Sequence, residues 1–312
     1  MRKLLCAALV VCLCLSGCAV KNDLQDETPI VLGDELVALD AEPALPVGYS
    51  PEHPGVKVKS NSDAEIDYSC ANDGYVMVRY KTQTDLRLKA QVKGPTTTYT
   101  YNVSQGEWIT FPLSDGPGEY KVVIFRNTTG NKYAAVLSQT LTYDPNDEFA
   151  PFLYSNQYVN IVDAPQTVLK AHELIGDTWD TLAQIQTIYD YVVNNFTYDK
   201  QKAATVQSGY LPDLDEVLAA KQGICFDYAA LMAGMLRSQG VPCKLVVGYA
   251  GTQYHAWISV WSWEYGWLDG TIYFNGQEWQ RLDPTFASSG HNSQRIIEYI
   301  QDDSNYTAKY LY

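Results

Sequence analysis

The chain has 312 residues, which is long enough for two domains and a sizeable hydrophobic core. Its hydrophobic fraction of 46% and charged fraction of 19% are those of an ordinary globular protein, so a wholly disordered chain is excluded. The formal net charge is −14, and the 22 Lys and Arg residues form no basic cluster. A chain this acidic binds nucleic acid poorly, and we expect no nucleic-acid partner.

Residues 1–17 have the features of an export signal. Arg2 and Lys3 precede the apolar run LLCAALVVCLCL, which is too short for an anchored membrane helix and has the length of a signal-peptide core. The run ends in LSGC at residues 15–18, which resembles the bacterial lipobox, where the chain is cut before the Cys and the Cys carries lipid. An ordinary signal peptide that happens to contain Cys is the alternative. The lipobox predicts an exported protein that is lipid-anchored through Cys18 to a bacterial membrane, on its extracellular or periplasmic side.

Residues 18–55 are predicted to form an extended tether after the lipidated Cys. This segment combines acidic residues with five prolines, a composition typical of extended linkers: Pro29, Pro43, Pro46, Pro51 and Pro54. Such a tether would hold the folded part of the chain away from the membrane.

Three cysteines remain once the signal is removed and Cys18 is lipidated, namely Cys70, Cys225 and Cys243. They are far apart in sequence and are not a disulfide framework. The chain has no CxxC pair and no EF-hand spacing, so we expect no metal and no cofactor. A thiol in an exported protein is a candidate for chemistry, although a single Cys is more often a buried apolar residue.

Residues 56–147 show hydrophobic alternation with a period of two. The alternating runs start at Val76, Leu86, Tyr99 and Tyr120, and turn signals containing Gly punctuate them at residues 72–74, 94–95, 115–118 and 129–131. Short alternating strands at this spacing predict an immunoglobulin-like antiparallel β-sandwich. The region has no cluster of His, Cys and acidic residues, which favours a spacer or binding module.

Residues 148–312 change to a helical period and later return to strands. Pro165 opens one helix, Asp177 is the expected cap of the next, and DLDEVLAAKQG contains a short third one. The second helix has apolar positions three or four residues apart at Trp179, Leu182, Ile185, Tyr189, Val192 and Phe196. A long helix then runs from Cys225 to Gly240, with Cys225, Ala229, Met232 and Leu236 on one stripe. The strands CKLVVGYA and HAWISVW, an aromatic hairpin turning at Asn275-Gly276, and a strand leading to Asp283 follow, so this region is predicted as α+β.

Three residues at element ends form the candidate catalytic set. Cys225 starts a helix, where the helix dipole favours a thiolate, the nucleophilic form of the thiol. His255, near a strand start, can activate the thiol and protonate a leaving group. Asp283, at a strand end, can orient the imidazole. Each residue alone is more often structural, and it is their combination in this order that predicts nucleophilic catalysis.

The segments GICFDYAALMAGMLRSQGVPCKLVVGYA, YHAWISV and WQRLDPT resemble the transglutaminase-like superfamily of papain-type thiol enzymes. The resemblance covers about residues 150–290. It implies a papain/transglutaminase-like catalytic domain within residues 148–312, after the β-sandwich. In that domain Cys225 would be the nucleophile, His255 the general base and acid, and Asp283 the orienting carboxylate.

Further residues are candidates for supporting roles in the same site. Tyr198, in the segment before the nucleophile, and Gln222 are candidate donors to an oxyanion, and Tyr254 and Trp257 are candidate walls of the substrate cleft. The aromatic residues between His255 and Asp283 either line that cleft or form the core of the sheet, and the sequence leaves both interpretations open.

The resemblance implies attack of a thiolate on a carboxamide and an acyl-enzyme, followed by water or an amine. We expect hydrolysis, as in a protease or amidase, because the sequence shows no dedicated lid that excludes water, although the aromatic hairpin at residues 261–279 could act as one. The alternatives are a transglutaminase that crosslinks protein glutamines and a non-catalytic surface binding protein on the same fold. The expected substrate is an extracellular protein, a peptide or a cell-wall peptide.

Overall fold

The computed structural model describes residues 49–269, 272–274, 279–281 and 305–312, all within a compact unit that spans Pro43–Tyr312. The predictions for the signal peptide and Cys18, for the Asn275-Gly276 turn and for Asp283 fall outside the described residues. Among the helices that the structure describes, none is long and apolar enough to cross a membrane.

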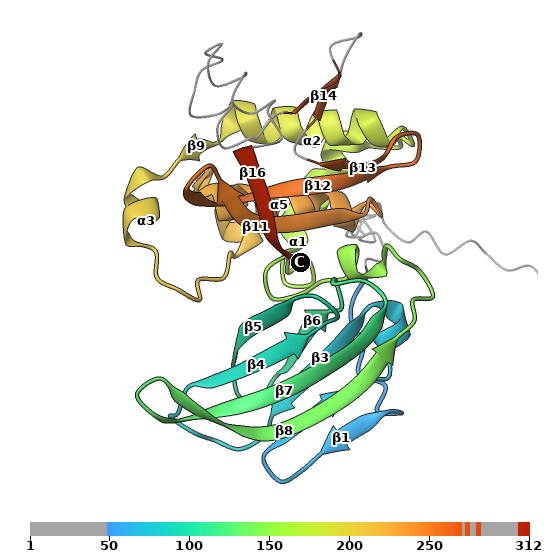
Figure 1. The fold of residues 1–312 in the computed structure, drawn as a ribbon. Coiled ribbons are helices and arrows are strands. Elements are labelled where there is room, and N and C mark those ends of the chain that lie inside the picture. The colour runs from blue at the N-terminus through green and yellow to red at the C-terminus, as the bar shows by residue number, and fades with distance from the viewer. Residues whose placement is uncertain (1–48, 270–271, 275–278, 282–304) are drawn as a thin grey trace, which may run out of the picture. The chain divides into compact units, whose positions relative to one another are not determined.

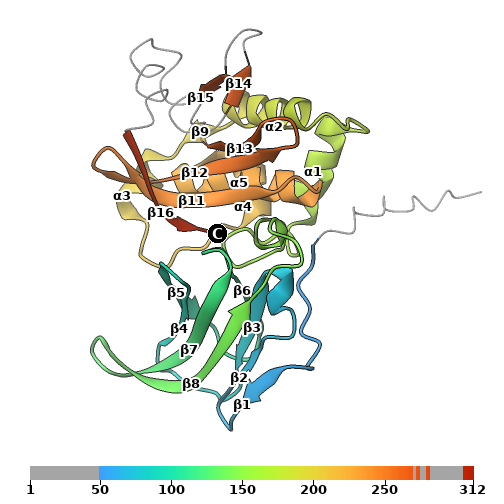
Figure 2. The same cartoon turned by 45° about the vertical axis from the view of Figure 1, so that its right-hand side comes forward.

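The N-terminal part of the described chain consists of two four-stranded antiparallel sheets (Figures 1 and 2). The first sheet has the order β1 (Val58–Ser60), β2 (Ala64–Asp67), β3 (Tyr75–Tyr80), β6 (Trp108–Pro112). The second has the order β5 (Thr98–Val103), β4 (Leu88–Lys93), β7 (Gly118–Thr129), β8 (Lys132–Tyr143). We call residues 58–143 the two-sheet region.

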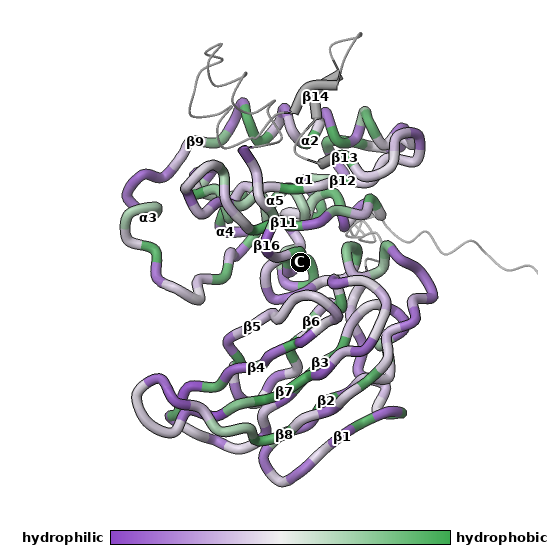
Figure 3. The backbone as a smooth tube through the Cα atoms, viewed as in Figure 1, coloured by the Kyte–Doolittle hydropathy of each residue, from purple (hydrophilic) through white to green (hydrophobic). Residues whose placement is uncertain are grey.

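Alternating side chains create the core of the two-sheet region. In β4 and in β5 every second residue is buried. Along β4 hydrophobic and hydrophilic residues alternate in the same way, as the green and purple segments in Figure 3 show. Val76 and Val78 of one sheet and Ala90 and Val92 of the other belong to the same buried cluster. The prediction for Leu86 is wrong, because this residue precedes β4 and is exposed. The finer prediction of an immunoglobulin-like topology stays a prediction.

The C-terminal part places helices before an antiparallel sheet, which agrees with the predicted α+β class. Its helices are α1 (Pro165–Ile175), α2 (Thr181–Asn195), α3 (Lys200–Thr205), α4 (Leu214–Ala220) and α5 (Cys225–Ser238), preceded by the short 3-10 turn Ala150–Phe152. The main sheet has the order β13 (Gly266–Asp269), β12 (Gln253–Ser262), β11 (Cys243–Ala250), β16 (Tyr306–Leu311). The remaining strands form two short pairs, β9 (Thr197–Tyr198) with β10 (Gln222–Gly223) and β14 (Ile272–Phe274) with β15 (Trp279–Arg281).

The start of α2 corrects one prediction. The N-cap is Asp180 and not Asp177: the Asp180 carboxylate accepts hydrogen bonds from the backbone N–H groups of Leu182 (3.0 Å) and Ala183 (3.3 Å). Trp179 therefore lies before the helix and is 94% exposed, although its spacing fits the helical pattern.

Helix α5 is the central element of the C-terminal part. It packs against α1, α2 and α4 and also against β11 and β12, so all residues from Asp227 to Ser238 are buried. The predicted stripe from Cys225 to Leu236 is thus only one side of a helix that is covered all round. A helix in this position holds its first turn rigidly against the sheet.

Arg237 fixes the far end of α5. Its fully buried guanidinium donates to the backbone carbonyls of Cys243 (2.8 Å), Tyr154 (3.1 Å) and Tyr312. Burial lowers the pKa of Arg237 to about 10, so it is still charged at neutral pH. One side chain therefore joins α5, β11, the segment before α1 and the residue that follows β16.

Candidate active site

The start of α5 places the thiol of Cys225 in the first helical turn. Ile224 is the N-cap in an extended conformation, and Gly223 lies opposite Tyr198 in the parallel pair β10–β9. A Cβ on Gly223 would lie 2.6 Å from the Cβ of Asp227, so only glycine fits there. The glycine of the Gly-x-Cys motif thus has a steric cause. The first N–H groups of α5, beside the thiol, have no intrahelical partners because they belong to the first turn.

A buried carboxylate lies two residues after the thiol. Asp227 is fully buried and accepts hydrogen bonds from the Ile224 N–H (2.9 Å) and the Tyr210 hydroxyl (2.6 Å). Lys202 of α3 pairs with the same carboxylate at 2.7 Å and also donates to the Tyr210 oxygen. The pKa of Tyr210 is raised, first by burial and then by its hydrogen bond to Asp227. Lys202 offsets the negative charge of Asp227 next to Cys225. The sequence patterns did not predict this cluster of Asp227, Tyr210 and Lys202.

His255 is the third residue of β12 and is buried. It lies opposite Gly248 of β11, and a Cβ on Gly248 would lie 2.0 Å from the Thr307 carbonyl oxygen of β16. Glycine at this position therefore lets β16 pass close to β11, where the register shifts between Val247 and Gly248. Close packing of β16 on β11 thus explains the glycine of the Val-x-Gly-Tyr motif, which lies opposite His255.

Cys225 and His255 line the same cavity, which has a volume of about 580 Å³. This is within the range of pockets that hold small ligands, roughly 300–1,000 Å³. Seven of its 20 lining residues are Tyr or Phe, namely Tyr158, Tyr198, Tyr210, Phe226, Tyr254, Tyr310 and Tyr312. We call it the thiol cavity.

The predicted site residues divide into two groups around this cavity. Cys225, His255, Tyr198 and Tyr254 line it together. Gln222 is exposed on β10 and does not line it. Trp257 also does not line it: its buried ring lies next to the His255 ring, with centroids 6.1 Å apart, and meets Tyr306 edge-on at 5.3 Å. The roles proposed for these residues stay predictions, as does that of Asp283.

The two-sheet region supplies one wall of the thiol cavity. Lys89 of β4 and Thr100 and Asn102 of β5 line it. Lys89 lies opposite Asn102 in the register of the two strands, and its Nζ donates to Asn102 Oδ1 at 3.0 Å. In both ribbon views the segment after α3 comes down beside β5 (Figures 1 and 2). The sequence patterns predict a separate module here and contain no signal that it contributes a wall to the thiol cavity.

Tyrosines that alternate with this wall connect the two-sheet region to β16. Tyr99 and Tyr101 point the other way from β5, into the core, and their rings lie 5.7 and 5.9 Å from the Tyr312 ring. The Ser114 hydroxyl also donates to the Leu311 carbonyl at 2.6 Å. These contacts hold the wall in place.

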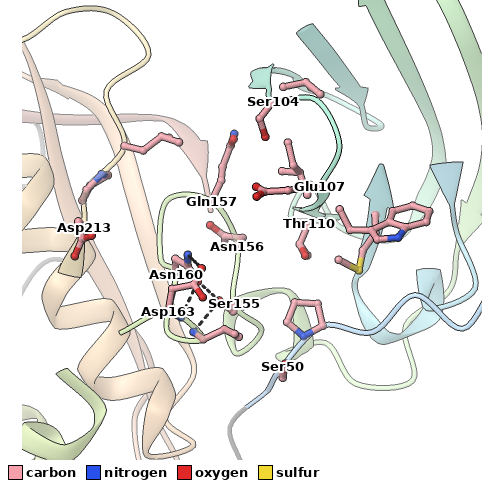
Figure 4. A pocket seen from close by; sticks show the side chains of 18 of the residues that line it. Ser50, Ser104, Glu107, Thr110, Ser155, Asn156, Gln157, Asn160, Asp163 and Asp213 are labelled. Carbon is pink, nitrogen blue, oxygen red and sulfur yellow. Dashed lines mark hydrogen bonds between the residues drawn. The ribbon is translucent and has the colours of Figure 1, made fainter. Parts of the chain in front are cut away.

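A second cavity, of about 730 Å³, has a different chemistry (Figure 4). Carboxylates of Glu107, Asp163 and Asp213 line it, and no Cys or His does. Two of these carboxylates also stabilise local structure: Asp163 accepts from Asn160 Nδ2 (2.8 Å), and Asp213 caps α4. Thiol chemistry therefore belongs to the other cavity.

The other two free thiols are poorer nucleophiles. Cys243 is fully buried, and burial raises its pKa to about 12. The pKa of Cys70 is also raised, chiefly by burial. Both directions reduce the thiolate fraction at neutral pH. Among the described residues, no group of three or more His, Cys, Asp or Glu side chains is arranged to hold a metal ion.

The described tryptophans of the aromatic segment lie elsewhere. The rings of Trp261, Trp263 and Trp267 lie 4.6, 5.7 and 6.1 Å from the ring of Phe149, and none of the three lines the thiol cavity. Lys244 Nζ lies 3.5 Å from the centroid of Trp267. These side chains pack on the segment before α1, so they are not walls of that cavity.

The family model described as the transglutaminase-like superfamily matches residues 170–284, which include Cys225, His255 and Asp283. These residues form a transglutaminase-like domain. This domain begins inside α1 and contains both described residues of the predicted catalytic set.

Relatives with the same domain are distant. The chain is 24% identical over 179 residues to the uncharacterized protein YebA of Bacillus subtilis, a match to 50% of this chain and 24% of that protein. It is 29% identical over 129 residues to a protein-glutamine gamma-glutamyltransferase of Pseudomonas aeruginosa, covering 36% of this chain and 17% of that protein. The chain thus spans less than a third of either relative. A solved structure, a candidate cysteine protease from Cytophaga hutchinsonii, has a TM-score of 0.37 at 15% identity, covering 76% of this chain and 83% of that one.

Proposed function

We propose that the protein is a thiol enzyme that acts on peptide or carboxamide bonds through an acyl-enzyme on Cys225. One observation carries the proposal: Cys225, at the start of α5, and His255, on β12, belong to a transglutaminase-like domain and line one cavity together. Neither Cys70 nor Cys243 lines that cavity, and burial raises the pKa of both thiols.

In the proposed reaction the Cys225 thiolate attacks the carbonyl carbon and forms a tetrahedral oxyanion. The N–H groups at the start of α5 are the candidate backbone donors to this oxyanion, and Tyr198, which lines the same cavity, is the candidate side-chain donor. His255 gives its proton to the leaving amine as the thioester forms, then takes a proton from the incoming water. Hydrolysis of the thioester releases the acid and restores the thiol. Asp283 has the role of orienting His255.

Water is the favoured acceptor because its concentration is about 55 M and an amine needs a site that excludes it. Transfer to an amine is the second candidate, because one curated relative is named as a protein-glutamine gamma-glutamyltransferase. A panel of carboxamide substrates offered with a labelled primary amine at millimolar concentration separates the two. Amine incorporation faster than hydrolysis would favour crosslinking.

Three variants test the proposed roles. Cys225→Ala and His255→Ala should each abolish turnover, and Asp283→Ala should leave weak activity because a carboxylate that orients a base does not itself react. Release of amine from the same carboxamide panel is the measurement. Full activity of Cys225→Ala would end the assignment of Cys225 as the nucleophile, whereas no turnover by the wild type would favour a non-catalytic binding protein.

We further propose that the protein is exported and held by lipid on Cys18, where it meets an extracellular protein, peptide or cell-wall peptide. The support is the LSGC sequence at residues 15–18 after an apolar run. Metabolic labelling with a fatty-acid analogue should mark the wild type and not Cys18→Ala. Equal labelling of both would contradict the anchor.

A further inference from the structure

We propose that Lys89 binds a carboxylate of the substrate inside the thiol cavity, so that the enzyme prefers peptides with an acidic group near the reacting carbonyl. This inference rests on the proposed function for its substrate but not for its binding site. It assigns a role to the two-sheet region, which forms one wall of the cavity.

The charge of the cavity wall supports a site for an anion. Among the described residues that line the thiol cavity, only Lys89 has a permanently charged side chain, and no lining side chain is a carboxylate. The whole chain has a net charge of −14, so this cavity differs in sign from the molecule around it. Charges in a partly enclosed site interact more strongly than charges in open water.

The contacts of Lys89 leave it able to bind an anion. Its ammonium donates to Asn102 Oδ1 at 3.0 Å, and two of its three N–H donors are available beyond that bond. Within the described part of the chain, no carboxylate lies within ion-pairing distance of Lys89, whereas Lys202, on the nearby α3, is paired with Asp227. The Lys89 charge is therefore not balanced by a protein carboxylate there.

Asn102 fixes the position of the Lys89 ammonium. It lies opposite Lys89 in the β4–β5 register, and Gly209 approaches it closely from the segment after α3. A Cβ on Gly209 would lie 2.2 Å from Asn102 Nδ2. Asn102 is thus held between Lys89 and Gly209, and this arrangement orders the ammonium in advance of binding.

The second cavity offers an internal contrast. It is lined by Glu107, Asp163 and Asp213 and by no Lys or Arg. An acidic peptide is repelled there and attracted to the thiol cavity. The proposed preference for an anion is therefore specific to the thiol cavity and is not a property of the surface in general.

The test measures binding without catalysis, in the Cys225→Ala background at low salt. Three peptides of equal length each contain a glutamine as the residue whose carboxamide would react. In the first it is followed by glutamate and an amidated C-terminus, in the second by glutamine and a free C-terminal carboxylate, and in the third by glutamine and an amidated C-terminus. Dissociation constants come from NMR titration. We expect at least one acidic peptide to bind about fivefold more tightly than the neutral one, the upper end for part-exposed ion pairs. The two acidic peptides distinguish a side-chain carboxylate from a terminal one.

Lys89→Met should remove this preference and Lys89→Glu should reverse it. Lys93→Met is the matched control, because Lys93 lies four residues along β4 and on the same face but does not line the cavity. Equal affinity for the three peptides, no binding of any, a preference that survives Lys89→Met, or an equal loss in Lys93→Met would each overturn the inference.

Failure of the proposed function gives a different result. If the charge preference holds but the protein with Cys225 intact turns over no peptide, the anion site stands and the enzyme proposal falls. If turnover occurs with equal kcat/KM for acidic and neutral peptides in wild type and Lys89→Met, the enzyme proposal stands and this inference falls.

Discussion

The three described thiols, Cys70, Cys225 and Cys243, differ in burial and in access to the thiol cavity. Only Cys225 lines that cavity beside a histidine. Because burial raises the pKa of Cys243 to about 12, less than about 1% of this thiol ionises below pH 10. The reactive form of a thiol is the thiolate, so these environments determine the order of modification.

We therefore expect Cys225 to be alkylated first between pH 6 and 8.5. Brief exposure to iodoacetamide followed by mass spectrometry gives the order directly. Cys225→Ser provides the background from the other two thiols. If Cys243 reacts before Cys225 in the native protein, the assignment of the nucleophile is wrong.

Gly248 is a second position where one residue controls the site. An added Cβ would lie 2.0 Å from the Thr307 carbonyl oxygen, so Gly248→Ala has to displace β16. We expect a loss of about 1–3 kcal/mol in the free energy of unfolding, together with reduced turnover. In Gly234→Ala the new Cβ would lie too close only to the end of the Leu214 side chain, at 2.6 Å, and its next neighbour, Ile161 Cγ2, would be at 3.4 Å. The Leu214 side chain can rotate away, so this control should stay nearer to wild-type stability than Gly248→Ala. Denaturant unfolding measures the free energy of unfolding of both variants, and equal values would contradict the steric argument.

At the scale of elements, the contact of Lys202 and Tyr210 with Asp227 joins α3 and its following segment to the start of α5. The Asp227 side chain is fully buried, whereas that of Lys202 is 29% exposed. Removing the cation leaves a buried carboxylate with hydrogen bonds but no opposite charge, which is the unfavourable way to break such a pair.

Lys202→Met should lower the free energy of unfolding by about 2–4 kcal/mol. Adding Asp227→Asn should recover part of that loss, because it removes the unpaired charge. The two variants and the double variant form a thermodynamic cycle measured by denaturant unfolding. A loss under about 0.5 kcal/mol for Lys202→Met would show that solvent already balances the carboxylate.

Local patterns predicted most elements well and failed where two local signals compete. The strands from Tyr75 and Thr98, the helix from Pro165 and the helix from Cys225 follow from period and punctuation alone. Asp177 and Asp180 are both suitable caps, and Trp179 between them fits the apolar spacing. Only the observed hydrogen bonds to Asp180 decide the start of α2.

The site shows the same division. Cys225 and His255 could be found because each lies in a short motif near the start of an element, and the glycine of the Gly-x-Cys motif is required by a local contact of Gly223 with Asp227. Lys89 and Asn102 could not, because alternation along β4 and β5 indicates only that these residues face away from the core. What faces them depends on contacts far away in the chain, and β16, which follows the last predicted strand, was not predicted.

At the scale of the whole described molecule, the two-sheet region and the transglutaminase-like domain are joined by aromatic contacts of Tyr99 and Tyr101 with Tyr312. Arg237 binds the Tyr312 carbonyl from the other side. A region that shares buried side chains with its neighbour should not unfold separately from it.

We expect one cooperative thermal transition. Ile66→Ala in the two-sheet core and Leu231→Ala in α5 each remove a fully buried side chain and should each cost about 2–5 kcal/mol. Differential scanning calorimetry should show both variants lowering the same single Tm. Two separate transitions, each moved by only one of the variants, would contradict the coupling.

Under the proposed function, the two-part wall of the thiol cavity also separates the residues that react from the residues that select the substrate. The thiol and the histidine belong to one domain, while Lys89, Thr100 and Asn102 come from a strand pair whose buried residues are on the opposite face. Residues on that outer face can change without disturbing α5 or β12. Copies of an ancestral gene could therefore diverge toward different peptides by surface substitutions on β4 and β5, while each copy inherits the same reactive centre. A protein engineer could change peptide preference in the same way, with a library of substitutions on the outer face of these two strands.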